Sequence, residues 1–320
     1  MAFDIFINVL LVPVGLAMLY FGAEWLVRGS VTIANKFRIS QLVIGLTIVA
    51  FGTSTPELSV SILSAIEGMP DVVLGNVVGS NIANIGLILG IAALIRPLLV
   101  AKSTIKKEIP IMVGVSILLV LISIDGKISF EEGVAFVIGI ILFTFFSYKS
   151  SKKEQTDIED ISTGLELAKK NVIPKSVILI GIGLGLLTFG SFLTVDNAVT
   201  IAKSVGLSER IIGLTIIAIG TSLPELVTSI VAAFRGHADL SVGNIVGSNV
   251  FNILAIIGIS ATIAGISASD DMFLDYYIMI AFSIVLIPIM CSGFIISRLE
   301  GSVLVAVYLV YVAFLFLGPN

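Results

Sequence analysis

Two glutamates, Glu57 and Glu225, lie in apolar stretches beside hydroxyl-bearing residues. Each ends the same short pattern, GTSTPE at 52–57 and GTSLPE at 220–225. Proline lacks an N–H and clashes with the preceding turn, so each pattern is expected to interrupt a helix and to free backbone carbonyls. In a membrane, freed carbonyls are tolerated only where a cation, water or another group satisfies them.

The oxygen donors of this pattern point to hard cations. Their side chains are those of Thr53, Ser54, Glu57, Thr221, Ser222 and Glu225. Hydroxyl, carbonyl and carboxylate oxygens are the donors preferred by Na⁺ and Ca²⁺, and no His or Cys is present in the pattern to favour a softer metal.

A second pattern, GSNIANI at 79–85 and GSNVFNI at 247–253, adds more polar oxygens. Within each copy a serine and an asparagine are four residues apart and so share one helix face. These pairs are Ser80 with Asn84 and Ser248 with Asn252. Glycines spaced by four, Gly75/Gly79 and Gly243/Gly247, allow a neighbouring backbone to approach closely, so these helices are expected to pack on the interrupted ones. Asn81 and Asn249 are either ligands or caps of the local backbone.

Both patterns belong to a duplicated segment. Residues 44–85 and 212–253 align without a gap at an offset of 168, with 25 identities in 42 positions. A repeated segment with an intramembrane acid and helix-breaking residues is typical of a secondary transporter's binding site.

Composition places the whole chain in the membrane. It is 57% hydrophobic and 12% charged, with a mean hydropathy of +1.13. These values exclude a soluble domain and leave no basic stripe for nucleic acid. At about 20 residues per spanning helix, the chain predicts an all-α polytopic protein with ten transmembrane helices. The expected spans are 5–27, 40–66, 71–95, 108–124, 130–148, 175–202, 208–234, 239–265, 272–292 and 301–317.

The distribution of basic residues predicts the topology. With both termini outside, fifteen of the 18 Lys and Arg fall on the inner side, which is a strong positive-inside bias. Residues 1–148 then form a first five-helix repeat, 149–174 a cytoplasmic linker, and 175–320 a second repeat. Because five is odd, the second repeat is inverted relative to the first, an arrangement that suits alternating access. The protein is expected in the cell membrane as a multi-pass protein, with the lipid bilayer as its surroundings.

At these motifs the chain resembles the calcium/cation antiporter superfamily, and within it the prokaryotic sodium/calcium exchangers. The resemblance covers nearly the whole chain, and it implies four clustered cation sites at which Na⁺ and Ca²⁺ compete. It also implies that the first helix of each repeat slides to change access. The ligands that it implies are Glu57, Glu225, Thr53, Thr221, Ser54, Ser222, Ser80, Ser248, Asn84 and the carbonyls of Ala50 and Ala218.

The chain departs from some relatives at Asn252, where they have aspartate. Asn252 is retained as a candidate ligand, although the missing charge puts its ion contact in question and argues against potassium dependence. The 149–174 segment is also too short for the regulatory calcium-binding domains of animal exchangers.

The sequence therefore predicts a Na⁺/Ca²⁺ antiporter, electrogenic if three Na⁺ exchange for one Ca²⁺, with the ions as substrates and no cofactor. We expect that the protein is not an enzyme and has no nucleic-acid partner. We also expect it to be a monomer. A Ca²⁺/H⁺ antiporter using the same glutamates is an alternative, because burial favours protonation of a carboxylate. A cation channel is less consistent with inverted repeats, since filters are usually built around an axis along the membrane normal. An intramembrane hydrolase or ATP-driven pump lacks any supporting motif.

Overall fold

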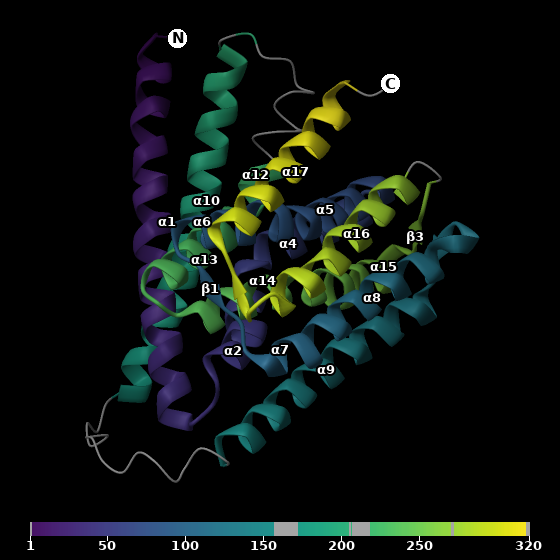
Figure 1. Cartoon of the computed structure of the whole chain (residues 1–320). Helices are drawn as coiled ribbons and strands as arrows, with labels where there is room; N and C mark the ends of the chain where they lie inside the picture. Colours follow the sequence, from purple (N-terminus) through teal and green to yellow (C-terminus); the bar gives the residue numbers. More distant parts are fainter. Residues whose placement is uncertain (1, 157–171, 205, 207–217, 270–271, 318–320) are drawn as a thin grey trace.

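Long apolar helices make up almost all of the computed structural model, which describes residues 2–156, 172–204, 206, 218–269 and 272–317 (Figure 1). A chain in lipid has no water to satisfy its backbone, so its spanning segments fold as helices. Eight described segments are long and apolar enough to span a membrane: Ile7–Phe37, Pro70–Ile95, Lys102–Asp125, Phe130–Lys149, Val172–Ser204, Ala238–Ala264, Met272–Cys291 and Arg298–Leu315.

The second predicted span is a bent pair of helices. Gln41–Thr53 and Thr55–Ile66 meet at 48° and make a ninth span if taken together. The first part of the seventh predicted span, 208–217, lies outside the described residues, and its remainder forms α12 (Ala218–Thr221) and α13 (Leu223–Phe234). The all-α polytopic fold class is thus confirmed, and every predicted span is mostly helical where the structure describes it.

Several helix boundaries differ from the prediction, and three of them show the same cause. The first helix, α1 (Ala2–Phe37), continues well beyond residue 27, and α9 (Phe130–Thr156) passes the predicted end at 148. The helix α10 (Val172–Ser204) begins before 175. Lysine and arginine are good helix formers, so a charge that marks the edge of the apolar region does not end the helix.

The remaining elements follow a similar order in the two halves, although α7 and η3 of the first half have no separate counterpart among the described elements of the second. In the first half these are α2 (Gln41–Ile44), the π-helix η1 (Gly45–Val49), α3 (Ala50–Thr53), α4 (Thr55–Ile66), α5 (Pro70–Ala83), the π-helix η2 (Asn84–Leu89), α6 (Gly90–Ile95), β1 (Leu98–Leu99), α7 (Lys102–Lys106), α8 (Glu108–Ile122), η3 (Ser123–Asp125) and β2 (Lys127–Ile128). In the second half these are α14 (Ala238–Phe251), the π-helix η5 (Asn252–Ile257), α15 (Gly258–Ala264), β3 (Ile266–Ser267), α16 (Met272–Cys291), β4 (Ile295–Ile296) and α17 (Arg298–Leu317).

The first helices of the two halves, α1 and α10, lie side by side and antiparallel (Figure 1). A Cβ added at Gly22 would lie 2.8 Å from the carbonyl oxygen of Gly183, and one added at Gly190 would lie 2.9 Å from that of Gly15. At the 168-residue offset Gly15 corresponds to Gly183 and Gly22 to Gly190. Each glycine therefore meets the counterpart of the other, as an inverted repeat requires.

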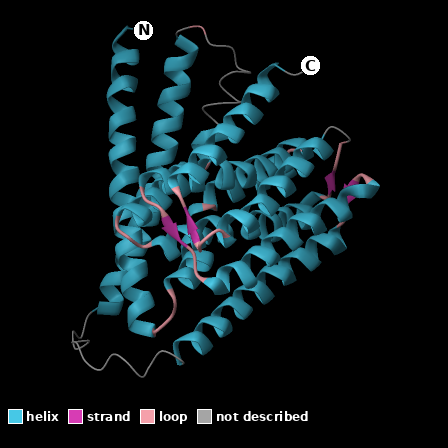
Figure 2. Ribbon diagram, viewed as in Figure 1, coloured by secondary structure: helices cyan, strands magenta, loops and turns pink. Residues whose placement is uncertain are grey.

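Four short strands were not predicted (Figure 2). Leu98–Leu99 (β1) pairs antiparallel with β4, and Lys127–Ile128 (β2) pairs antiparallel with β3. At the same offset β1 corresponds to β3 and β2 to β4, so each pair joins one half to the other reciprocally. Strands of two residues carry no local sequence signal, and only contacts between distant segments define them.

The core of the fold is α14. All of its residues from Leu240 to Phe251 are buried, and it contacts α13, η1 and α2. Gly243 and Gly247 make the approach to the bent helix possible, because added Cβ atoms would lie 2.5 Å from the carbonyl oxygen of Leu42 and 2.7 Å from that of Leu46. The predicted packing through small residues is thus confirmed for this pair.

Candidate ion-binding site

The helix interruption occurs at a serine in each half. Ser54 separates α3 from α4 with φ −82° and ψ 11°, and Ser222 precedes α13 with φ −89° and ψ 9°. Pro56 and Pro224 lie in the first turns of the helices that follow, where a missing N–H costs least. The break therefore comes two residues before the proline on which the prediction was based.

One carbonyl freed by a proline has found a protein partner. Pro224 cannot donate to the carbonyl of Gly220, four residues earlier, and that oxygen accepts a hydrogen bond of 2.7 Å from Ser191 of α10. A side chain of the opposite long helix thus satisfies the interrupted backbone, as expected for irregular structure at membrane depth.

The two glutamates are tied to the opposite half by reciprocal hydrogen bonds. Ser54 Oγ donates to Glu225 Oε1 at 2.8 Å, and Ser222 Oγ donates to Glu57 Oε1 at 3.2 Å. Both carboxylates are 1% exposed. The sequence prediction that these residues share one site is consistent with this geometry, in which Ser54 also lies 3.1 Å from Ser248 Oγ.

Four buried oxygens on candidate ligands have no hydrogen-bond partner among the described residues. They are Glu57 Oε2, Glu225 Oε2, Asn84 Oδ1 and Asn252 Oδ1. They form two equivalent pairs under the 168-residue offset. A buried oxygen without a partner costs free energy, because an apolar interior provides neither a hydrogen-bond donor nor a cation for it. All four are donors that suit a hard cation, so this donor set fits bound Na⁺ or Ca²⁺.

Asn81 and Asn249 act across the interface between the halves and do not cap their own helices. Asn84 Nδ2 donates to Asn249 Oδ1 at 2.9 Å, and Asn252 Nδ2 donates to Asn81 Oδ1 at 3.0 Å. With their amide nitrogens held in this way, Asn84 and Asn252 keep their oxygens available. A π-helix begins at each of these two asparagines, and π-turns are frequent at functional sites.

Asn76 and Asn244 are site residues that the sequence reasoning missed. Asn76 Nδ2 donates to the Glu57 carbonyl at 3.1 Å and to Ser61 Oγ at 2.8 Å. Asn244 Nδ2 lies 3.5 Å from the Glu225 carbonyl and 2.9 Å from Ser229 Oγ. These contacts fix the turn that carries each glutamate. The signal was in the repeat, because both asparagines are identical between the copies.

The other candidates differ in position. Thr53 Oγ1 lies 3.0 Å from the Val49 carbonyl and 3.2 Å from Asn244 Oδ1. The Ala50 carbonyl accepts the N–H of Ser54 at 3.0 Å, so the helix already engages one of its lone pairs. Thr221 ends α12, directly before Ser222. Ala218 begins α12, and its side-chain surroundings lie outside the described residues.

The serines Ser80 and Ser248 are not equivalent in their surroundings. Ser248 is fully buried beside Ser54, whereas Ser80 lines a cavity of about 330 Å³ that also includes Asn76 and Asp275. No described residue lies within 4 Å of a Cβ added at Gly75 or Gly79. Segment 209–217, the counterpart of the helix that covers α14, lies outside the described residues.

The site has the chemistry of an oxygen cage with two acids. Within the described ranges no group of three His, Cys, Asp or Glu residues could hold a metal. A cation here would instead depend on two carboxylates and on the amide and hydroxyl oxygens around them. Such a cage is suited to ions that must leave again, because it carries little formal charge.

Comparison with known proteins places this arrangement in a family. The family model described as sodium/calcium exchanger protein matches residues 7–149 and again 175–317. The chain is 40% identical over 310 residues to the putative antiporter CaxA of Alkalimonas amylolytica, covering 95% of this chain and 97% of that protein. It is 32% identical to the sodium/calcium exchanger MaX1 of Methanosarcina acetivorans, covering 97% and 99%.

A solved structure gives the same result for the fold. The sodium-calcium exchanger NCX_Mj, in a structure soaked with zero Na⁺ and Ca²⁺, matches with a TM-score of 0.84 and 32% identity, covering 97% of this chain and 99% of that one. The two family-model matches coincide with the two halves joined by reciprocal strands and hydrogen bonds. This chain is a multi-pass membrane protein that belongs to the sodium/calcium exchanger family.

Proposed function

We propose that this protein exchanges Na⁺ for Ca²⁺ across a cell membrane by alternating access, at the site between Glu57 and Glu225. The observation that carries the proposal is the pair of buried carboxylates held by serines of the opposite half, each with one oxygen that has no hydrogen-bond partner among the described residues. Membership of the exchanger family supports the same function.

Charge balance in the cage explains why the two ions compete. With both glutamates ionised the cage carries about −2, which one Ca²⁺ or two Na⁺ neutralise. An unneutralised pair of acids is expensive at membrane depth, so the empty site does not cross readily between its two access states. Obligatory occupation turns the protein into an exchanger and prevents a leak.

A third Na⁺ would leave one positive charge on the site. Moving one charge across the membrane potential is worth about 2.3 kcal/mol per 100 mV. Exchange of three Na⁺ for one Ca²⁺ would therefore be electrogenic, and a membrane potential would bias its direction. Uptake measured at potentials set by K⁺ and valinomycin tests this stoichiometry.

The two halves provide the conformational change. Their antiparallel first helices pack through glycines, which allow close backbone contact without interlocking side chains. In an inverted repeat, exchanging the conformations of the halves exchanges the side that is open. The orientation with both termini outside and the 149–174 linker inside is part of this proposal and rests on the positive-inside bias.

The test is uptake of ⁴⁵Ca²⁺ into Na⁺-loaded proteoliposomes, with and without an outward Na⁺ gradient at fixed pH. Uptake that requires the Na⁺ gradient supports the proposal. Glu57→Gln and Glu225→Gln are expected to abolish it, because either change removes one charge of the cage. The matched control is Glu131→Gln, an exposed carboxylate in the first turn of α9, which should exchange normally. Uptake driven by a pH gradient and indifferent to Na⁺ would assign the protein to Ca²⁺/H⁺ exchange instead.

A further inference from the structure

A polar cavity lies between α5, α16 and α17, beside the two glutamates of the ion site. It has a volume of about 330 Å³. Five of the side chains that line it carry oxygen atoms, namely those of Asn76, Ser80, Asp275, Tyr308 and Tyr311. We call it the Asp275 cavity, after the carboxylate that lies in the first turn of α16.

The carboxylate of Asp275 has no basic partner among the described residues. Its Oδ1 accepts a hydrogen bond of 2.9 Å from the Tyr311 hydroxyl, and no described donor bonds to its Oδ2. Acids within spanning segments are expensive, and they usually face a protein interior or a water-filled cavity and mark the path of an ion. Asp275 has this position, because it lines a cavity inside the helix bundle.

The Asp275 cavity extends from the edge of the membrane towards the ion site. Under the proposed orientation α16 begins outside at Met272, and α5 begins outside at Pro70. At the rise of an α-helix, Asp275 lies about 4.5 Å along α16 and Ser80 about 15 Å along α5. Half of a bilayer's hydrocarbon core is about 15 Å thick. The lining therefore reaches from an acid near the outer boundary to a candidate ligand deep in the membrane.

Two side chains at the deep end of the cavity have oxygens that their counterparts use for hydrogen bonds. In the second half, Asn244 Oδ1 lies 3.2 Å from Thr53 Oγ1, and Ser248 Oγ lies 3.1 Å from a serine of the opposite half. The counterparts at the 168-residue offset are Asn76 and Ser80. No described residue donates to Asn76 Oδ1 or bonds to Ser80 Oγ. These two oxygens are therefore available to an occupant of the cavity.

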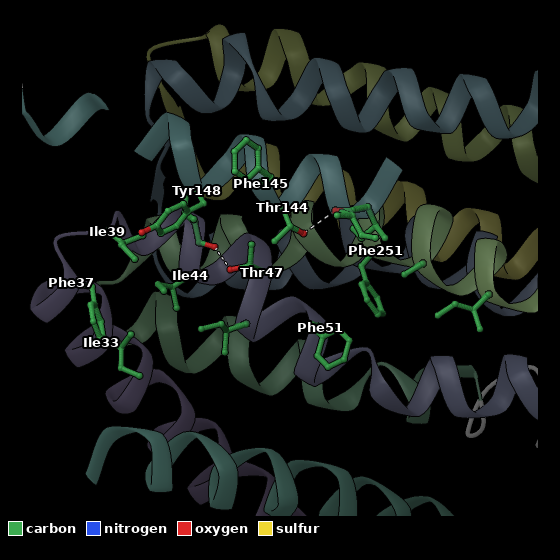
Figure 3. Close-up of a pocket in the computed structure, with 16 residues that line it drawn as sticks. Ile33, Phe37, Ile39, Ile44, Thr47, Phe51, Thr144, Phe145, Tyr148 and Phe251 are labelled. Carbon is green, nitrogen blue, oxygen red and sulfur yellow. Dashed lines mark hydrogen bonds between the residues drawn. The ribbon is translucent and has the colours of Figure 1, made fainter. Parts of the chain in front are cut away.

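The equivalent surface of the other half is apolar (Figure 3). Tyr308 and Ala83 of the Asp275 cavity correspond to Ile140 and Phe251, which line a groove of about 850 Å³. No described carboxylate lines that groove, and its two threonines donate to carbonyls four residues earlier in the chain. The fold itself thus does not require polar groups at this place, and the acid is a feature of one half.

We infer that the Asp275 cavity binds one partly hydrated hard cation, Na⁺ or Ca²⁺, on its way between the outer solution and the glutamates. The carboxylate supplies the charge, and amide and hydroxyl oxygens of the lining are further ligands of the kind that both ions take. The volume leaves room for several water molecules, each of which occupies about 30 Å³ in the liquid. A single carboxylate gives weak binding, so the ion can leave again.

Terbium luminescence tests this binding directly. Tb³⁺ takes the oxygen ligands of Ca²⁺ and emits when a tyrosine close to it absorbs light, and Tyr308 and Tyr311 line the cavity. The protein for this test carries Glu57→Gln and Glu225→Gln, which remove both carboxylates of the ion site. We expect it to show emission that excess Ca²⁺ displaces and that falls to background after the further change Asp275→Asn.

Two more variants separate ion binding from a structural role. Glu131→Gln is the matched control, because Glu131 is an exposed carboxylate in the first turn of α9, and it should leave the emission unchanged. Tyr311→Phe removes the bond to Asp275 but keeps the carboxylate, so emission through Tyr308 should persist. If Asp275 only ties α16 to α17, Asp275→Asn and Tyr311→Phe should lower the midpoint of thermal unfolding alike, and neither should change the emission.

Two results would overturn the proposal. One is the absence of Ca²⁺-displaceable emission from the Glu57→Gln/Glu225→Gln protein, which needs no change in the cavity itself. The other is equal emission after Asp275→Asn and after Glu131→Gln.

Exchange measurements ask whether the cavity delivers ions to the glutamates, and this step rests on the proposed function. In membrane vesicles of known orientation, Asp275→Asn should raise the Ca²⁺ concentration for half-maximal exchange about tenfold when Ca²⁺ is supplied from the outer side. The reason is that a charged cleft concentrates its counter-ions by about tenfold or more. Ca²⁺ supplied from the inner side should show no change, and an equal change from both sides would contradict an outer site.

The binding test and the exchange test fail separately. Tb³⁺ emission is measured in a protein that lacks the carboxylates of the ion site, so its absence would remove the cavity site even if the wild type exchanges ions. Binding at Asp275 in a protein that shows no Na⁺-dependent Ca²⁺ uptake would instead contradict the proposed function.

Discussion

Replacing Ser54 by alanine is the sharpest probe of the interface at the ion site. Ser54 is fully buried, and its hydroxyl donates to Glu225 Oε1 across the two halves at 2.8 Å. The change removes one hydroxyl and leaves the backbone break at this position in place. It therefore separates the oxygen chemistry of the site from the local helix geometry.

The expected magnitude follows from the charge on the acceptor. A hydrogen bond to a charged group contributes about 1.5–3 kcal/mol. If Ser54 both orients the carboxylate and offers its oxygen to the ion, losing it should raise the Ca²⁺ concentration for half-maximal exchange by roughly 10- to 150-fold. Ser222→Ala should have a smaller effect, because its bond to Glu57 is longer, at 3.2 Å.

The assay is Na⁺-dependent ⁴⁵Ca²⁺ uptake over a range of Ca²⁺ concentrations, with calorimetry on the purified protein to measure binding directly. Ser59→Ala is the matched control, because Ser59 is exposed on α4, which follows Ser54, and its hydroxyl donates to the Thr55 carbonyl of its own helix at 2.9 Å. Ser54→Thr keeps a hydroxyl and should retain part of the affinity. A Ser54→Ala protein with an affinity within twofold of the control would refute the role given to this residue.

Three further outcomes are expected. Gly22→Ala should lower the midpoint of thermal unfolding, because the new Cβ would lie 2.8 Å from a carbonyl oxygen of α10. Gly181→Ala is the control and should leave the midpoint unchanged, because its new Cβ would have no described atom within 4 Å. Differential scanning fluorimetry of both variants in the same detergent compares them. Asn244→Leu should cost about 1–3 kcal/mol of unfolding free energy by leaving its buried partners unpaired, and an unchanged denaturation midpoint would contradict this. Arg235→Gln should barely change stability, because its 2.8 Å ion pair with Glu24 is solvent-screened, and high salt should have equally little effect on the wild type.

Much of the fold could be predicted because hydropathy and duplication act at the scale of whole helices. The spans, the duplication and the break near Pro56 follow from apolar run length and proline sterics. Helix ends were less predictable, since Arg28 marks the edge of an apolar run but lies on the exposed face of a helix that continues to Phe37. The strands could not be predicted for a different reason, because Leu98 pairs with Ile296 only when the two halves pack together.

The residues of the site were more predictable than the hydrogen bonds between them. The repeat identified Glu57 and Glu225 because each occurs at the same place in both copies. It did not reveal that Asn81 and Asn249 bond to partners in the other half, since a spacing of three residues describes one helix and not its neighbour. The supporting role of Asn76 depends likewise on the approach of α5 to the turn that follows Ser54.

The reciprocal strand pairs have a consequence for how the two halves are held together. Because β1 bonds to β4 while their counterparts β3 and β2 bond to each other, the contact is isologous and uses both copies of the same edge. A closed contact of this kind leaves no equivalent edge free to recruit a third copy. In a dimer of identical chains every substitution at such an interface is made twice. Here both halves belong to one polypeptide, so a substitution can occur in one half and not in the other. Ser80 and Ser248 can therefore have different surroundings although the fold is symmetric.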